Sequence, residues 1–148
     1  MKSLRFSLSF LLLCFFHFTY SQVTSVPASA KDNFAKQYPA AQDVEWDNDI
    51  VNVNVHFTLD GQKMNAAYSN KGIWKNTSMD IAFEKLPAEV QDGLSKSKYA
   101  DRNITDVKLI YLPADVVQYR IKAEKNDVEK KYLYFDASGK LLRDNITL

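Results

Sequence analysis

The 148-residue sequence has little cysteine and little glycine: one residue of the first and four of the second. The cysteine, Cys14, lies in an apolar segment near the N-terminus, so the rest of the chain has no thiol. This lack excludes disulfides, thiol nucleophiles and cysteine metal sites from that part, where stability must come from packing. The four glycines are scattered and form no phosphate-binding loop.

An excess of charge of one sign is also lacking. The chain has 19 Lys and Arg against 18 Asp and Glu, a formal net charge of +1. A nucleic-acid surface needs concentrated positive charge, so the composition argues against a nucleic-acid partner.

The N-terminus has the pattern of a secretory signal peptide. Lys2 and Arg5 precede a nearly unbroken apolar run at residues 6–18, and the small residue Ser21 follows. The run is shorter than the roughly 20 residues that a membrane span needs. We therefore predict a signal peptide at residues 1–21 and an exported protein, periplasmic or secreted, with no membrane span after cleavage. The remaining 148 − 21 = 127 residues, 22–148, are the length of one domain.

Two segments that begin with proline predict helices. "VPASAKDNFAKQYP" starts at Val26 and "LPAEVQDGLSKSKYA" starts at Leu86, so that their first prolines, Pro27 and Pro87, are 87 − 27 = 60 residues apart. Proline is favoured in the first turn of a helix, where its missing N–H costs nothing. The apolar stripes at helical spacing are Ala30, Phe34 and Tyr38 in the first segment, and Val90 and Leu94 in the second.

Alternation with a period of two predicts strands after each helix. Residues 50–59 are predicted as one strand with one buried and one wet face, and Asp60-Gly61 predicts a tight hairpin after it. The same alternation returns between residues 107 and 135. The predicted inward positions are Val51, Val53, Val55, Phe57, Leu59, Met64, Ala66, Tyr68, Val107, Leu109, Tyr111, Val117, Tyr119, Ile121, Ala123, Lys131, Leu133 and Phe135.

A polar turn that closes on glycine occurs twice. "YSNKG" ends at Gly72 and "FDASG" ends at Gly139, and apolar residues follow each. We therefore predict an α+β fold of two tandem repeats, at about residues 24–78 and 79–148, each with one helix and four antiparallel strands.

With these segments the chain resembles the beta-lactamase-inhibitor-like, PepSY-like proteins of bacterial envelopes. The resemblance is carried by "VPASAKDNFAKQYP", Trp46, "DGQKMNAAYSNKGIW", "LPAEVQDGL" and "YFDASGKLL". It implies two αβ4 units, with the helices packed on one face of the sheet and the other face open. It supplies no catalytic residue.

No pattern for catalysis or metal binding stands out. His56 is the single histidine after residue 21, whereas a zinc site needs three or four ligands, and no G-x-S-x-G elbow accompanies it. Asp47 and Asp49 could serve calcium, but Asp and Asn are also the usual residues of a tight turn, which we favour. We expect no enzyme activity, no cofactor and no metal.

The candidate binding residues lie on the predicted open face. Tyr132 and Tyr134 have the opposite parity to the buried positions of their strand, and Arg120 and Lys122 share their face in the neighbouring strand. His56 is on the polar face of the first repeat. Tyrosine and arginine are typical of binding hot spots.

These residues predict a binding module with a protein or peptide partner. The alternative is a small or polymeric envelope ligand such as a glycan, because tyrosines also stack on sugars. Exposed tyrosines can also simply favour strands. The matching positions of the first repeat hold Asn65 and Ala67, so any such site is expected to be unequal between the two repeats.

Overall fold

The structure, a computed structural model, describes residues 25–49 and 51–147. The predicted signal peptide at residues 1–21 lies outside the described residues. The elements are α1 (Ala28–Gln37), β1 (Gln42–Asn48), β2 (Asn52–Leu59), β3 (Gln62–Ser69), β4 (Trp74–Asp80), the 3-10 helix η1 (Phe83–Lys85), α2 (Ala88–Ser95), β5 (Asn103–Leu112), β6 (Val116–Glu124), β7 (Lys130–Asp136) and β8 (Leu141–Thr147).

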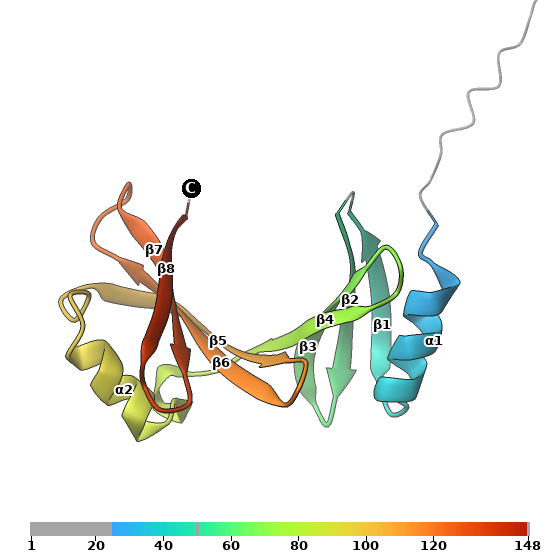
Figure 1. Cartoon of the computed structure of the whole chain (residues 1–148), viewed down its shortest axis with the longest axis horizontal. Coiled ribbons are helices and arrows are strands. Elements are labelled where there is room, and N and C mark those ends of the chain that lie inside the picture. The colour runs from blue at the N-terminus through green and yellow to red at the C-terminus, as the bar shows by residue number, and fades with distance from the viewer. Residues whose placement is uncertain (1–24, 50, 148) are drawn as a thin grey trace, which may run out of the picture.

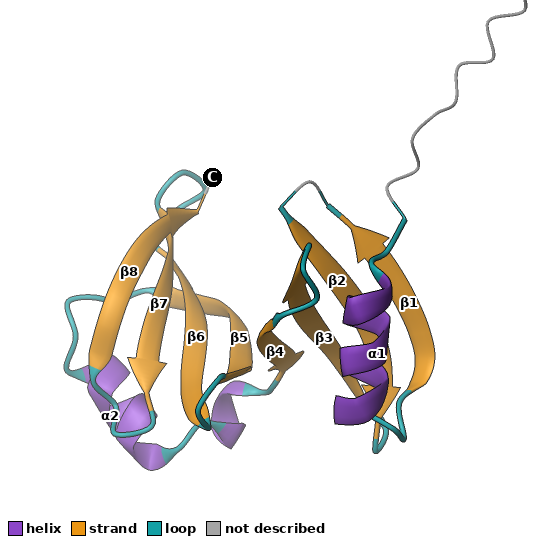
Figure 2. Ribbon diagram, turned by 45° about the vertical axis from the view of Figure 1, so that its right-hand side comes forward, coloured by secondary structure: helices purple, strands orange, loops and turns teal. Residues whose placement is uncertain are grey.

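All eight strands form one sheet in chain order, and every neighbouring pair is antiparallel. One helix precedes each set of four strands, which confirms the α+β fold with tandem αβ4 halves. Figure 1 shows both helices on the outside of a bent sheet, so that the face without helices, the open face, lines the inside of a trough. In Figure 2 α1 lies in front of its strands and α2 behind its own, because the sheet turns strongly between the halves.

Each helix closes a separate hydrophobic core against its own half of the sheet. Four residues of the predicted helical stripes are buried, namely Ala30, Phe34, Val90 and Leu94. Tyr38, the third residue of the first stripe, lies just after α1 and is half-buried against the same core. Burying a large apolar side chain contributes about 1.5–3 kcal/mol, so these few contacts fix each helix to the sheet. The buried strand residues are Val53, Val55, Phe57, Ala66 and Tyr68 under α1, and Val107, Ile121, Ala123, Leu133 and Phe135 under α2.

The repeated glycine turns also hold the helices in place. Gly72 and Gly139 have positive φ angles of 78° and 82°, and each lies against the first turn of the helix of its half. A Cβ atom at Gly139 would lie 1.9 Å from the carbonyl oxygen of Glu89, and one at Gly72 would lie 2.6 Å from the carbonyl carbon of Ser29. Glycine is therefore required at both turns for the close approach of the hairpin to the helix.

One predicted strand start is wrong. β2 begins at Asn52, and Val51, predicted to point inward, is 68% exposed. The hairpin closes with the Asp49 N–H donating to the Asn52 carbonyl at 2.9 Å, which leaves Val51 in the turn. Turn geometry, rather than the alternation, decides where the strand begins.

The two halves meet at β4 and β5, a junction that we call the seam. Four residue pairs join the strands there, from Thr77 opposite Tyr111 to Asp80 opposite Lys108. The sheet is therefore continuous from β1 to β8, although the two cores are separate.

Candidate functional site

A row of four large side chains crosses the open face of the second half. Lys108, Arg120, Tyr134 and Arg143 lie opposite one another in register on β5, β6, β7 and β8, the strands seen side by side in Figure 2. Opposite residues on one face have Cβ atoms about 4.5–5.5 Å apart, so that such side chains contact their neighbours. The row therefore forms one continuous basic and aromatic surface.

Two arginines of this surface stack on two tyrosines. The guanidinium carbon of Arg120 lies 4.3 Å from the ring centroid of Tyr132, and that of Arg143 lies 3.9 Å from the ring centroid of Tyr134. Such cation–π contacts contribute about 0.5–1 kcal/mol at exposed sites. They also orient both guanidinium groups before any ligand arrives.

The basic residues differ in how their charge is balanced. Arg120 Nη2 lies 2.7 Å from Asp106 Oδ2, and Lys122 Nζ lies 2.9 Å from Glu124 Oε1. The hydrogen bond between Lys122 and Glu124 raises the pKa of the lysine and lowers the pKa of the carboxyl. Within the described chain, Arg143 makes no ion pair, so its charge remains available to a partner.

A hollow of about 230 Å³, which we call the seam hollow, opens on this surface. Five strands line it, β4 to β8, so both halves contribute to it. Its lining includes three cations, Lys108, Arg120 and Arg143, and among the residues that the structure describes it includes no carboxylate. Arg120, one of the lining residues, has a buried Nε that finds no hydrogen-bond partner among the described residues.

The structure brings four of the five predicted site residues together. Arg120, Lys122, Tyr132 and Tyr134 are neighbours on β6 and β7, on the open face. His56 lies on β2, four strand positions from β6 in the sheet and so roughly 19 Å away. It is exposed, and Asn65 Nδ2 lies 3.2 Å from its Nδ1. Grouping His56 with the other four is therefore not supported by the geometry.

Sequence alternation missed Arg143 for an identifiable reason. Leu141 pairs with Phe135, but Arg143 pairs with Tyr134, so Leu142 is an extra residue at a β-bulge. The bulge reverses the parity of the strand and turns Arg143 to the open face. The first half has the same irregularity, because Trp74 pairs with Tyr68 and Asn76 pairs with Ala67.

Asp49, one of the two carboxylates considered for calcium, contacts a side chain of its own hairpin. Asn54 Nδ2 donates to Asp49 Oδ2 at 3.2 Å, as expected of a hairpin turn. Residues 25–49 and 51–147 hold no group of three or more His, Cys, Asp or Glu side chains that could bind a metal ion. No helix in the same part of the chain has the length and apolar character of a membrane span.

Two αβ4 halves on one antiparallel sheet, with both helices on one face, define a class of tandem α+β proteins with an open sheet face. Residues 51–143 match the family described as putative beta-lactamase-inhibitor-like, PepSY-like, and the chain belongs to this family. No curated protein matches the chain.

Solved structures show the same fold. A DUF2874 family protein from Bacteroides ovatus has 24% sequence identity and a TM-score of 0.74, over 82% of this chain and 88% of that one. A BLIP-like protein from Bacteroides fragilis has 22% identity and a TM-score of 0.74, over 83% and 87%. A putative periplasmic protein from Bacteroides eggerthii has 22% identity and a TM-score of 0.71, over 82% and 89%.

Proposed function

We propose that this protein is an exported, non-catalytic module that binds a protein or peptide partner through the open face of its second half. The observation that carries the proposal is the row of Lys108, Arg120, Tyr134 and Arg143 on a rigid sheet beside the seam hollow. Arginine and tyrosine are enriched at binding hot spots, and side chains already held by stacking lose little entropy on binding.

Two features favour a protein partner over a glycan. The seam hollow, about 230 Å³, is smaller than the roughly 300–1,000 Å³ of small-ligand pockets, so it fits one anchoring side chain. A sugar would stack on a ring face of Tyr132 or Tyr134, but Arg120 and Arg143 already cover one face of each ring. The same arginines are well suited to the carboxylates and carbonyl groups of a peptide.

Export and the absence of catalysis rest on separate observations. The predicted signal peptide supports export, and one similar structure is described as a putative periplasmic protein. The ring of His56 lies 3.2 Å from the amide nitrogen of Asn65, and the sequence has no G-x-S-x-G elbow to supply a nucleophile. These observations support a binding role in the bacterial envelope.

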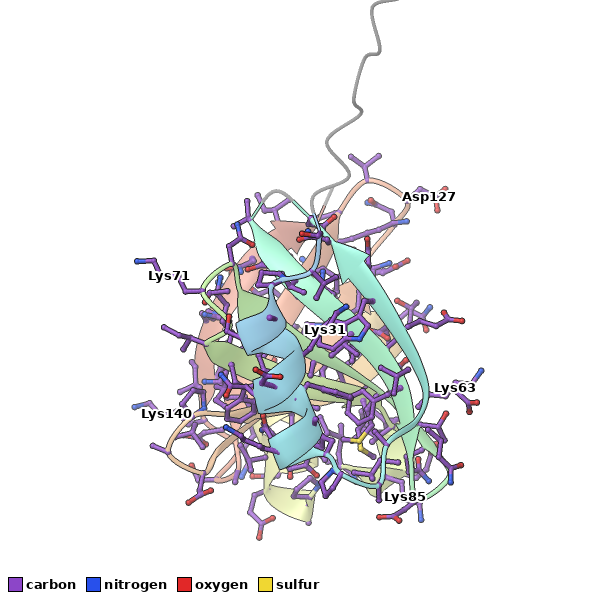
Figure 3. The ribbon with its side chains drawn as sticks, turned by 90° about the vertical axis from the view of Figure 1, so that its right-hand side faces the viewer. Lys31, Lys63, Lys71, Lys85, Asp127 and Lys140 are labelled. Carbon is purple, nitrogen blue, oxygen red and sulfur yellow. The ribbon has the colours of Figure 1, made fainter. Side chains whose placement is uncertain are left out.

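The test compares capture of an envelope protein by wild-type protein and by matched variants. The face variant is Tyr134→Ala with Arg143→Ala, and the control is Lys31→Ala on α1, the helix that faces the viewer in Figure 3. Both are first shown to melt cooperatively by circular dichroism. A purified partner should bind the face variant at least tenfold more weakly, because it has lost two anchor residues, and the control normally. Equal affinity of the face variant and the wild type would sink the proposal.

A further inference from the structure

We infer that the seam hollow binds a side-chain carboxylate from an acidic segment of the partner. This inference rests on the proposed function and names the chemistry that the open face recognises. It is argued from the charges, the unpaired donor and the size of the hollow.

The charges of the seam hollow favour an anion. Lys108 and Arg120 have carboxylate partners, Asp80 at 2.7 Å and Asp106 at 2.7 Å, which lie outside the lining of the hollow. Arg143 has none within the described chain, so one positive charge remains uncompensated. A single carboxylate balances that charge, whereas a phosphate monoester carries about −1.5 to −2 and would exceed it.

One hydrogen-bond donor of a residue that lines the hollow also lacks an acceptor among the described residues. Arg120 Nε is buried without a partner, and a buried donor is normally paired. The planar guanidinium fork of arginine matches the two oxygens of a carboxylate. Asn76, Ser78 and Gln118 add neutral polar groups to the same lining, and the first two come from β4 of the first half.

The size and the apolar part of the hollow fit one side chain. Ile110 and Leu112 line it beside the cations, and they can contact the methylene groups of a Glu or Asp side chain. The volume of about 230 Å³ is below the roughly 300–1,000 Å³ of small-ligand pockets and suits one side chain. The acid therefore enters as one residue of a chain that continues over Tyr132 and Tyr134.

The first experiment measures the carboxylate site directly, without a partner. The Nε–Hε NMR signals of Arg120 and Arg143 are followed as N-acetylglutamate methylamide, its glutamine analogue or inorganic phosphate is added. The glutamate probe should move both signals saturably, and the neutral analogue should move neither. Arg102, which pairs with Glu129, is the internal control. Equal shifts with the glutamine analogue, or saturable shifts with phosphate alone, would overturn the inference.

The second experiment selects random peptides that bind the wild-type protein and lose binding in the Tyr134→Ala variant. These peptides should be enriched in Glu and Asp. Arg143→Gln should weaken them about tenfold or more, Arg143→Lys less, and Lys31→Gln not at all. Face-dependent peptides without acidic residues would overturn the carboxylate site and leave the proposed function standing. The absence of any face-dependent peptide would count against both.

Discussion

The two halves of this protein have the same arrangement of helix and strands but different side chains on the open face of the sheet. Equivalent positions follow from the strand registers, because each half pairs its four strands in the same way. The row across the open face of the first half is Asp47, Asn54, Ala67 and Asn76, and the row of the second half is Lys108, Arg120, Tyr134 and Arg143. Small and neutral or acidic groups thus stand where the second half has bulky cations and an aromatic ring.

On the face of the sheet that packs against the helices, the two halves are similar, because an equivalent tyrosine hydrogen bond occurs in both. In the first half Tyr38 Oη lies 2.6 Å from Thr77 Oγ1, and in the second half the Tyr99 hydroxyl donates to Asp144 Oδ2 at 2.5 Å. Thr77 and Asp144 occupy matching places, opposite Ala66 and Leu133. A tyrosine after the helix thus bonds to the last strand in both halves. The side chains that pack under the helices are therefore similar in the two halves, whereas those on the open face differ.

The largest effect is expected where both halves have the same constraint. Gly139→Ala should cost about 4 kcal/mol or more, because the new Cβ would meet the backbone of Glu89 and the residue has a positive φ angle. Gly61→Ala is the matched control: its φ angle is 76°, but nothing lies within 4 Å, so it should cost about 1–2 kcal/mol. Urea unfolding measures both. Equal losses would show that conformation, rather than contact with the helix, requires the glycine.

An intermediate effect on stability is expected at the tyrosine hydrogen bonds, because Tyr99 bonds to a carboxylate, Asp144, whereas Tyr38 bonds to a neutral hydroxyl, Thr77. Hydrogen bonds from Tyr99 and Lys131 lower the pKa of Asp144 to about 2 from its usual 3.8. A carboxyl whose pKa is lower in the folded state stabilises the protein above pH 3.8, and this contribution is lost as the pH falls toward 2.

Asp144→Asn should therefore lower stability by about 1 kcal/mol at neutral pH, after allowance for solvent screening, and by much less near pH 2. Thr77 does not titrate, so Thr77→Val should lower stability by a pH-independent amount. Chemical denaturation across this pH range measures both. If Asp144→Asn lost the same stability at neutral pH as near pH 2, the charge of Asp144 would not be the cause of its effect.

The smallest effect on stability is expected where the halves differ most. Converting Tyr134 and Arg143 to their first-half equivalents, Tyr134→Ala with Arg143→Asn, should cost about 1 kcal/mol or less, because it removes one exposed cation–π contact. Thermal unfolding measures the change. A loss of stability above about 3 kcal/mol would mean that Tyr134 and Arg143 are needed for folding and are not simply surface residues.

Much of the frame could be predicted from the sequence, because burial imposes simple periods. The stripe of Ala30 and Phe34, the alternation around Val55 and the glycine turns each follow from one local rule. The site was less accessible to such rules. Arg143 lies on the open face only because Leu142 is bulged, and strict alternation would have turned it to the helices. The seam hollow depends on pairing between β4 and β5, strands separated by α2, and no local pattern predicts that contact.

The seam has a mechanical consequence. Each half has its own closed core, and the two halves of the sheet are joined by the four residue pairs of the seam. A change in the angle at the seam would alter the distance between β4 and β8, which both line the seam hollow, without any change inside either core. The shape of the hollow between Ser78 and Arg143 therefore depends on the angle between the two halves of the sheet.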